Sequence, residues 1–161
     1  MGLLAEQIVI DCEPSILEGL FRDRRTAWIE PLLRLAGDEG EAAGLLLLGE
    51  RAHGDRRQAP RRRAHAVEVR AAERGASTFK VGLRWRTTDY RALFVQFDGT
   101  LEVRALDDRA VVSVEGIFAA PAGAPLGRTS ERATRRAAEL AVRSLLGHLR
   151  SAVEERSASV G

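Results

Sequence analysis

The sequence predicts an α+β fold: a curved antiparallel β-sheet wrapped around a long C-terminal α-helix, with two short N-terminal helices. Two observations support this prediction. From Phe79 to Phe118, apolar and polar residues alternate through three runs separated by short turns, which is typical of an antiparallel meander. After a rigid connection at residues 121–127, the apolar residues take helical spacing and continue to about Arg156.

The first third of the chain predicts shorter elements. Residues 7–10 form a short strand that ends at Asp11, and Pro14 suits the first turn of a helix over residues 14–21. Residues 26–35 predict a second short helix or turn, broken at Pro31. We expect a turn at residues 37–41 and a buried strand at residues 45–48, which lie between two glycines. The polar segment 53–63 is predicted to be a loop.

The three alternating runs define one apolar face of the predicted sheet. Phe79, Val81, Leu83 and Trp85 point one way in the clearest run. The second run, residues 93–103, contains Gly99, which permits a bulge or a sharp bend. A tight turn at residues 107–108 leads to the third run, residues 112–118. A weaker strand is expected at residues 65–70, with a turn at residues 73–77.

The predicted C-terminal helix has three arcs when its residues are placed on a helical wheel. A charged arc should face water, and a bulky arc should pack on the sheet. The third arc is mostly small and holds Ala133, Ala137, Leu140, Ala141, Ser144, His148 and Ala152. It has two interpretations: close packing against the N-terminal helices, or the wall of a cavity in which Ser144 or His148 orients a ligand.

Composition limits the classes of partner. The 161 residues are most simply one domain, spanning residues 1–161. The 25 basic residues, of which only Lys80 is lysine, nearly balance 23 acidic ones, so composition predicts no nucleic-acid partner. A single cysteine and no visible signal peptide favour a cytoplasmic protein. No apolar run approaches the ~20 residues that cross a bilayer, so no stable membrane insertion is expected.

Known catalytic and metal-binding motifs are not found. The chain has no nucleophile elbow, no P-loop and no dinucleotide fingerprint. Its three histidines are scattered and one cysteine cannot complete a thiolate site, so neither a metal nor a cofactor is expected. Cys12 is interpreted as a small buried hydrophobe. The arginines at positions 56–63 have no aromatic residue among them, which favours a solvated loop over a phosphate-binding site.

The sheet and helix segments resemble a known family. The runs 79–86, 93–101 and 112–116, with Pro125-Leu126-Gly127 and the helix segment 138–146, are similar to START-like (SRPBCC, helix-grip) proteins. In particular they resemble bacterial members of the actinobacterial, polyketide cyclase-like type. The resemblance is best over residues 79–150. It implies a deep apolar cavity between sheet and helix that binds lipids, polyketides or similar molecules.

The predicted function is therefore binding or transport of a small hydrophobic molecule by a monomer or homodimer. The predicted ligand-lining residues are Trp28 at the mouth, then Phe79, Val81, Leu83, Trp85, Val95, Phe97, Ala141, Ser144 and His148. An alternative is a cyclase- or aromatase-like enzyme that uses His148, Tyr90 or an arginine as acid or base. A third possibility is an interaction protein whose interior is filled by bulky side chains.

Overall fold

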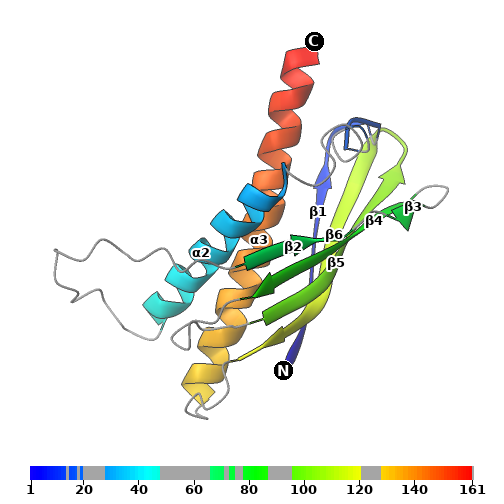
Figure 1. Ribbon diagram of the computed structural model, residues 1–161. Helices are drawn as coiled ribbons and strands as arrows, with labels where there is room; N and C mark the ends of the chain where they lie inside the picture. Colours follow the sequence, from blue (N-terminus) through cyan, green and yellow to red (C-terminus); the bar gives the residue numbers. More distant parts are fainter. Residues whose placement is uncertain are drawn as a thin grey trace.

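An antiparallel sheet packs against two long helices in the computed structural model (Figure 1). The structure describes residues 1–13, 15–17, 19, 28–47, 66–70, 73–74, 78–86, 96–120 and 128–160. In chain order, its elements are β1 (Gly2–Ile10), α2 (Glu30–Leu47), β2 (Ala66–Val69), β3 (Glu73–Arg74), β4 (Thr78–Arg86), β5 (Gln96–Leu106), β6 (Arg109–Ala119) and α3 (Arg128–Val160).

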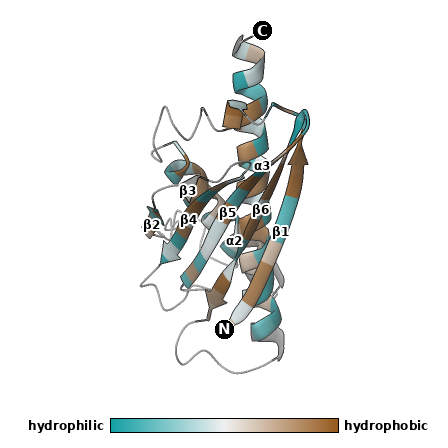
Figure 2. Cartoon of the chain, turned by 90° about the vertical axis from the view of Figure 1, so that its right-hand side faces the viewer, coloured by the Kyte–Doolittle hydropathy of each residue, from teal (hydrophilic) through white to brown (hydrophobic). Residues whose placement is uncertain are grey.

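The strand order is β1-β6-β5-β4-β2, with β3 paired to the far end of β4, and every pairing is antiparallel. Figure 2 shows the sheet in front with α2 and α3 behind it, so both helices cover the same face. This face is called the concave face below, and the opposite one the convex face. The predicted helix-grip α+β fold is confirmed: a meander of β4, β5 and β6 leads into a long C-terminal helix.

The predicted alternation matches the observed burial. Val81, Leu83 and Trp85 are buried on the concave face, while Lys80 and Arg86, which precede and follow them, are exposed. The tight turn predicted at residues 107–108 joins β5 to β6, with Asp107 in the left-handed region at a φ of 51°. Gly99 forms no bulge: it pairs in register with Leu83 and Gly116.

Several sequence predictions need correction. β1 begins at Gly2 and is therefore longer than the predicted strand. Glu73 and Arg74, predicted to lie in a turn, pair with Lys80 and Phe79 as strand β3. The predicted turn at 37–41 and strand at 45–48 are both wrong, because one helix, α2, runs through both segments as far as Leu47.

α2 is continuous because its breaking residues occupy suitable positions. Pro31 lies in the first turn, where a missing N–H costs no intrahelical hydrogen bond. Gly40 lies where α2 meets α3: a Cβ added there would be 2.3 Å from the carbonyl oxygen of Ala137 and 2.7 Å from the Cβ of Ala141. The glycine that suggested a turn thus permits close approach of two helices.

α3 has 33 residues, so it is about 50 Å long at 1.5 Å per residue. It begins at Arg128, directly after the predicted connection, and ends four residues after the predicted end at Arg156. Its small arc faces α2, as the contacts of Ala137 and Ala141 with Gly40 show, which agrees with the close-packing interpretation of this arc. No helix in the described part of the chain is long and apolar enough to cross a membrane.

Some predictions fall on residues that the structure does not describe. They include residues 14, 18 and 20–21 of the first helix, residues 26–27 of the second, the arginine-rich loop 53–63, residue 65 of the weaker strand, residues 75–77 of the predicted turn, residues 93–95 of the second run and the connection 121–127. Residues 15–17 and 19 are helical, as predicted for the first short helix.

Candidate functional site

A row of aromatic side chains crosses one end of the concave face. The register pairs Trp85 of β4 with Phe97 of β5, and Phe97 with Phe118 of β6. The Trp85 and Phe97 rings meet edge to face, with centroids 5.0 Å apart and an interplanar angle of 68°. This geometry is favourable for aromatic pairs. All three side chains are buried.

Two glycines of the sheet leave the space that the Phe97 ring occupies. Gly99 and Gly116 are register partners in the next row of the sheet. A Cβ at either position would lie 2.6 Å from a carbon of the Phe97 ring. The ring therefore lies over backbone that carries no side chains, and it fills the space that two larger residues would occupy.

The aromatic row is tied to α2 by a buried hydrogen bond. Trp85 Nε1 donates to the backbone carbonyl oxygen of Leu33 over 2.6 Å. Leu33, Gly37 and Glu41 follow one another at intervals of four residues, so they form one stripe along the helix. The bond shows that this stripe of α2 faces strand β4.

α3 divides the interior into two halves. Level with the aromatic row, where Arg135 lies over the Phe118 ring, α3 buries only small side chains, namely Ala133, Thr134, Ala137, Ala138 and Ala141. Together with the row and the α2 glycines, these residues line what we call the aromatic half. Farther along, α3 buries Val142, Leu145, Leu146, Leu149 and Val153, which belong to the aliphatic half.

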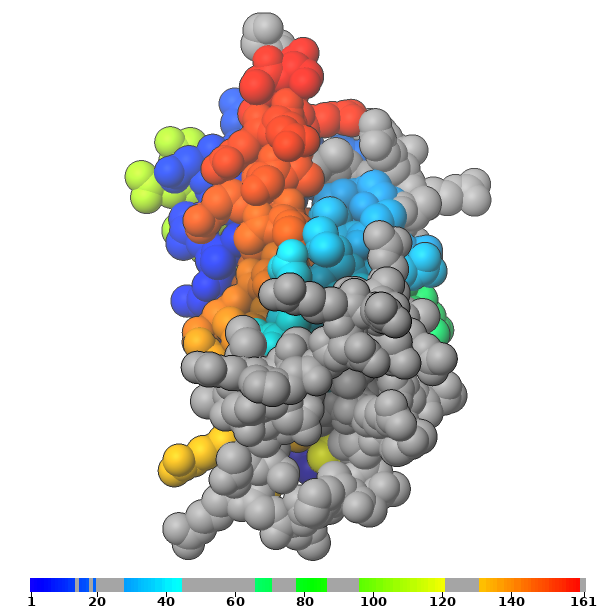
Figure 3. Space-filling view, turned by 90° about the vertical axis from the view of Figure 1, so that its left-hand side faces the viewer, coloured from blue at the N-terminus to red at the C-terminus, as the bar shows by residue number. Residues whose placement is uncertain are grey.

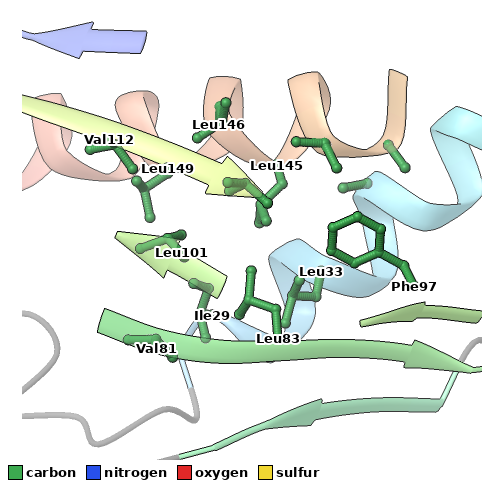
Figure 4. Packing of buried hydrophobic residues seen from close by; sticks show 14 of the residues in the cluster. Ile29, Leu33, Val81, Leu83, Phe97, Leu101, Val112, Leu145, Leu146 and Leu149 are labelled. Carbon is green, nitrogen blue, oxygen red and sulfur yellow. The ribbon is translucent and has the colours of Figure 1, made fainter. Parts of the chain in front are cut away.

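The aliphatic half is filled by its own side chains. Figure 4 shows Leu145, Leu146 and Leu149 of α3 directed toward residues of the sheet and of α2, with the Phe97 ring to one side. Their partners in this cluster include Ile29, Leu33, Val81, Leu101 and Val112, each at most 1% exposed. This half stabilises the fold by apolar burial and leaves no described polar group inside.

Each of the two long helices buries one polar side chain. Among the residues that the structure describes, Glu41 and Thr134 are the two polar or charged residues classed as buried, with 3% and 7% exposure. Glu41 lies two helical turns beyond Leu33 on the stripe of α2 that faces β4. Thr134 lies one turn before Ala138 on α3. Burying a polar group costs free energy unless the group has a hydrogen-bond partner, so both side chains need polar atoms nearby.

The predicted lining residues separate into groups. Trp85, Phe97 and Ala141 lie in the aromatic half, and Leu83 lies in the neighbouring row of the sheet. Phe79 and Val81 belong to the aliphatic half, with Phe79 only partly buried. Trp28 lies just before α2, partly buried against the core. Val95 lies outside the described residues. A ligand-lining role for these residues remains a prediction.

Ser144 and His148 lie at the boundary between the two helices. His148 Nε2 is 3.1 Å from a carboxylate oxygen of Glu39 in α2, and the two side chains are 28% and 42% exposed. Ser144 is partly buried. The His148–Glu39 pair joins α2 to α3 at the molecular surface. Tyr90, the other residue suggested as an acid or base, lies outside the described residues.

Cys12 is buried next to the end of β1, as predicted. Burial raises the pKa of its thiol above the ordinary value of 9.0, and the nearby Asp11 carboxylate raises it further. Within the described ranges, no group of three or more His, Cys, Asp and Glu side chains is arranged to hold a metal ion.

Sequence reasoning missed three buried residues. Phe118 had a usable signal, because it shares the face of Val112 and Val114 in an alternating run. Glu41 was hidden by the prediction of a turn at residues 37–41. Thr134 was not singled out, because a single threonine near the start of a helix has no distinctive pattern.

Comparisons with known proteins support the fold. No protein-family model matches the chain, and no curated protein matches it. The crystal structure of TTHA0849 from Thermus thermophilus is similar, with a TM-score of 0.52 and 13% identity over 97% of this chain and 99% of that one.

Two further structures match less well. Ara h 8.0201 gives a TM-score of 0.44 at 13% identity, over 93% of this chain and 98% of the other. The ZhuI aromatase/cyclase from Streptomyces sp. R1128 gives 0.40 at 13% identity, over 99% and 98%.

Proposed function

We propose that this protein binds one small hydrophobic molecule in the aromatic half of its interior and acts as a carrier in the cytoplasm. The strongest support is that large aromatic residues of the sheet lie level with small residues of α3. Trp85, Phe97 and Phe118 lie level with a stretch of α3 that buries only Ala and Thr side chains, two of which, Ala137 and Ala141, also contact Gly40 of α2. Ligand sites in proteins are commonly apolar and aromatic, with a few polar groups that fix orientation.

The two halves of the interior have different tasks, so the fold can be stable while the ligand site is empty. The aliphatic half packs without a ligand and stabilises the contact between sheet and helices. The Phe97 ring rests on two glycines, so no side chain lies beneath it in the next row of the sheet. We propose that this ring moves when a ligand enters.

The aromatic row indicates the chemistry of the ligand. Three buried rings suit contact with an apolar body, so the proposed ligand is mainly apolar. As part of this proposal, the chain is a START-like protein of the bacterial, polyketide cyclase-like type, which the fold supports.

Native mass spectrometry of the protein purified from its own host tests this function. We expect one bound organic molecule per chain, released on denaturation and identified after extraction; the same spectrum distinguishes monomer from homodimer. Ala138→Phe fills the aromatic half and should abolish the adduct. Ala42→Phe, on the exposed face of α2, is the matched control and should retain it.

The result that would contradict the proposal is a chain without any adduct that also takes up no member of a hydrophobic metabolite library. An adduct retained by folded Ala138→Phe would place the ligand elsewhere.

The burial of Glu41 favours a second candidate function. In this case the protein is an enzyme that acts on the ligand it encloses. An acid–base catalyst in an apolar interior needs a titratable group within reach of the substrate, and Glu41 is a buried carboxyl of α2. Glu41→Gln distinguishes the two functions. An enzyme should keep ligand binding and accumulate unconverted substrate, whereas a carrier should release the same molecule as the unmodified protein does.

A further inference from the structure

Two exposed aliphatic side chains lie together at one end of the sheet. Leu3 of β1 and Ile117 of β6 are register partners on the convex face, 62% and 48% exposed. Side chains of such cross-strand partners are about 5 Å apart, so they form one apolar spot. This exposure is not explained by the core, since both residues point away from it.

Arginines of α3 lie at the same end of the molecule. Residues 128–136 contain four arginines and one glutamate, a net charge of +3. Arg132, Arg135 and Arg136 are exposed. The Arg135 guanidinium lies 5.8 Å from the centroid of the Phe118 ring, and Phe118 pairs with Gly2. Arg135 therefore lies over the concave face, and Leu3 and Ile117 lie on the convex face at the same end of the molecule, where Figure 1 shows the N-terminus and the start of α3. Figure 3 shows α3 between β1 on one side and α2 on the other.

Ion pairing along α3 accounts for part of this charge. The Arg135 and Arg136 side chains share one carboxylate, Glu139, at 3.7 Å each. Arg132, Arg135 and Arg136 all lie beyond the first turn of α3, where the dipole at the N-terminal end has little effect on them. Because two arginines share one glutamate, net positive charge stays exposed at this end of the helix.

We propose that this end of the molecule, formed by Leu3, Ile117 and the three exposed arginines of α3, docks on an anionic lipid surface. Peripheral membrane binding combines a small inserted apolar area with electrostatic attraction of Lys and Arg to acidic headgroups. A nucleic acid would use the arginines but would gain nothing from exposed Leu and Ile. The proposal does not depend on the ligand site, since docking requires only the surface.

Co-sedimentation with vesicles tests this docking surface in the full chain without added ligand. We expect binding to phosphatidylcholine vesicles that contain phosphatidylglycerol and little binding to phosphatidylcholine alone. Arg132→Glu with Arg136→Glu should lower the apparent association constant about tenfold or more. Leu3→Thr with Ile117→Thr should also lower it, because the inserted apolar area is lost. Circular dichroism verifies that each variant is folded.

Matched controls lie at the opposite end of the sheet. Arg104→Glu with Arg109→Glu makes the same change in net charge at side chains that are 64% and 58% exposed. Leu106→Thr removes an aliphatic side chain that is 53% exposed. Both controls should bind like the unmodified protein.

Three results would overturn the proposal. They are no binding to anionic vesicles, equal loss in the control variants, and full binding by the Leu3/Ile117 variant. The last result would mean that the apolar pair does not enter the lipid surface and that charge alone holds the protein on the vesicle.

Discussion

The indole of Trp85 and the backbone of Leu33 are joined by a 2.6 Å hydrogen bond in the core. Trp85 comes from β4 and Leu33 from α2, 52 positions earlier in the chain. The bond satisfies the one polar atom of the largest buried side chain. It also places the Leu33 turn of α2 against strand β4.

Trp85→Phe should destabilise the protein by about 2 to 4 kcal/mol, because it removes both the hydrogen bond and part of a fully buried ring. Urea unfolding followed by circular dichroism measures this loss. A loss below about 1 kcal/mol with an unchanged slope would mean that the bond does not hold α2 on the sheet.

Gly40→Ala and Gly147→Ala should change stability in opposite directions, although both are the same substitution within a helix. At Gly40 the new methyl group meets α3 backbone at 2.3 Å, so overpacking should cost about 1 to 3 kcal/mol. At Gly147 nothing lies within 4 Å, so the higher helix propensity of Ala should stabilise by about 0.5 to 1 kcal/mol. Thermal and urea unfolding measure both changes. Equal effects at the two sites would contradict the close approach of α2 and α3.

The same contact shows what sequence reasoning could and could not predict. Alternation over β4 and β6 predicted the buried faces correctly, because each strand has one face in the core and period two reveals it directly. The glycines of α2 resembled turn residues, because their use in close helix packing depends on Ala137 and Ala141, which come far later in the chain. The small arc of α3 left two interpretations open for the same reason.

The aromatic half was only partly predictable. Trp85 and Phe97 were recognised from alternation, but the pairing of Gly99 with Gly116 depends on strand register, which the two runs alone do not specify. The burial of Glu41 could be recognised only after the structure showed that α2 is continuous. Long-range pairing, not local propensity, determines these features.

The Cys12 thiol should react slowly with Ellman's reagent in the native protein at about pH 8 and rapidly in urea. It is 7% exposed and its raised pKa reduces the thiolate fraction. The ratio of the two rates, measured by absorbance, provides the test. Rapid stoichiometric reaction of the native protein would mean that the end of β1 opens readily.

Glu102 should make a small contribution to stability that is lost in acid. Its hydrogen bond from Arg104 lowers the pKa of Glu102 below the ordinary value of 4.5, assisted by Lys80 and opposed by desolvation. A lowered folded-state pKa gives stabilisation that is complete above about pH 4.5 and disappears as pH falls through the folded value.

Glu102→Gln should therefore be less stable than the unmodified protein at about pH 7, by at most about 1 kcal/mol for a surface pair. The difference should shrink below pH 4.5. Urea midpoints measured across this range provide the comparison. A difference that is constant with pH would assign the effect to packing.

Energy transfer from Trp85 to a bound probe tests the proposed ligand site most directly. The chain has two tryptophans, so Trp28→Phe leaves Trp85 as the single donor, and N-phenyl-1-naphthylamine serves as an apolar acceptor. We predict saturable quenching of Trp85 with one probe per chain, and its loss when Ala138→Phe is added to the folded protein. No saturable quenching, or quenching that Ala138→Phe leaves unchanged, would contradict a ligand site in the aromatic half.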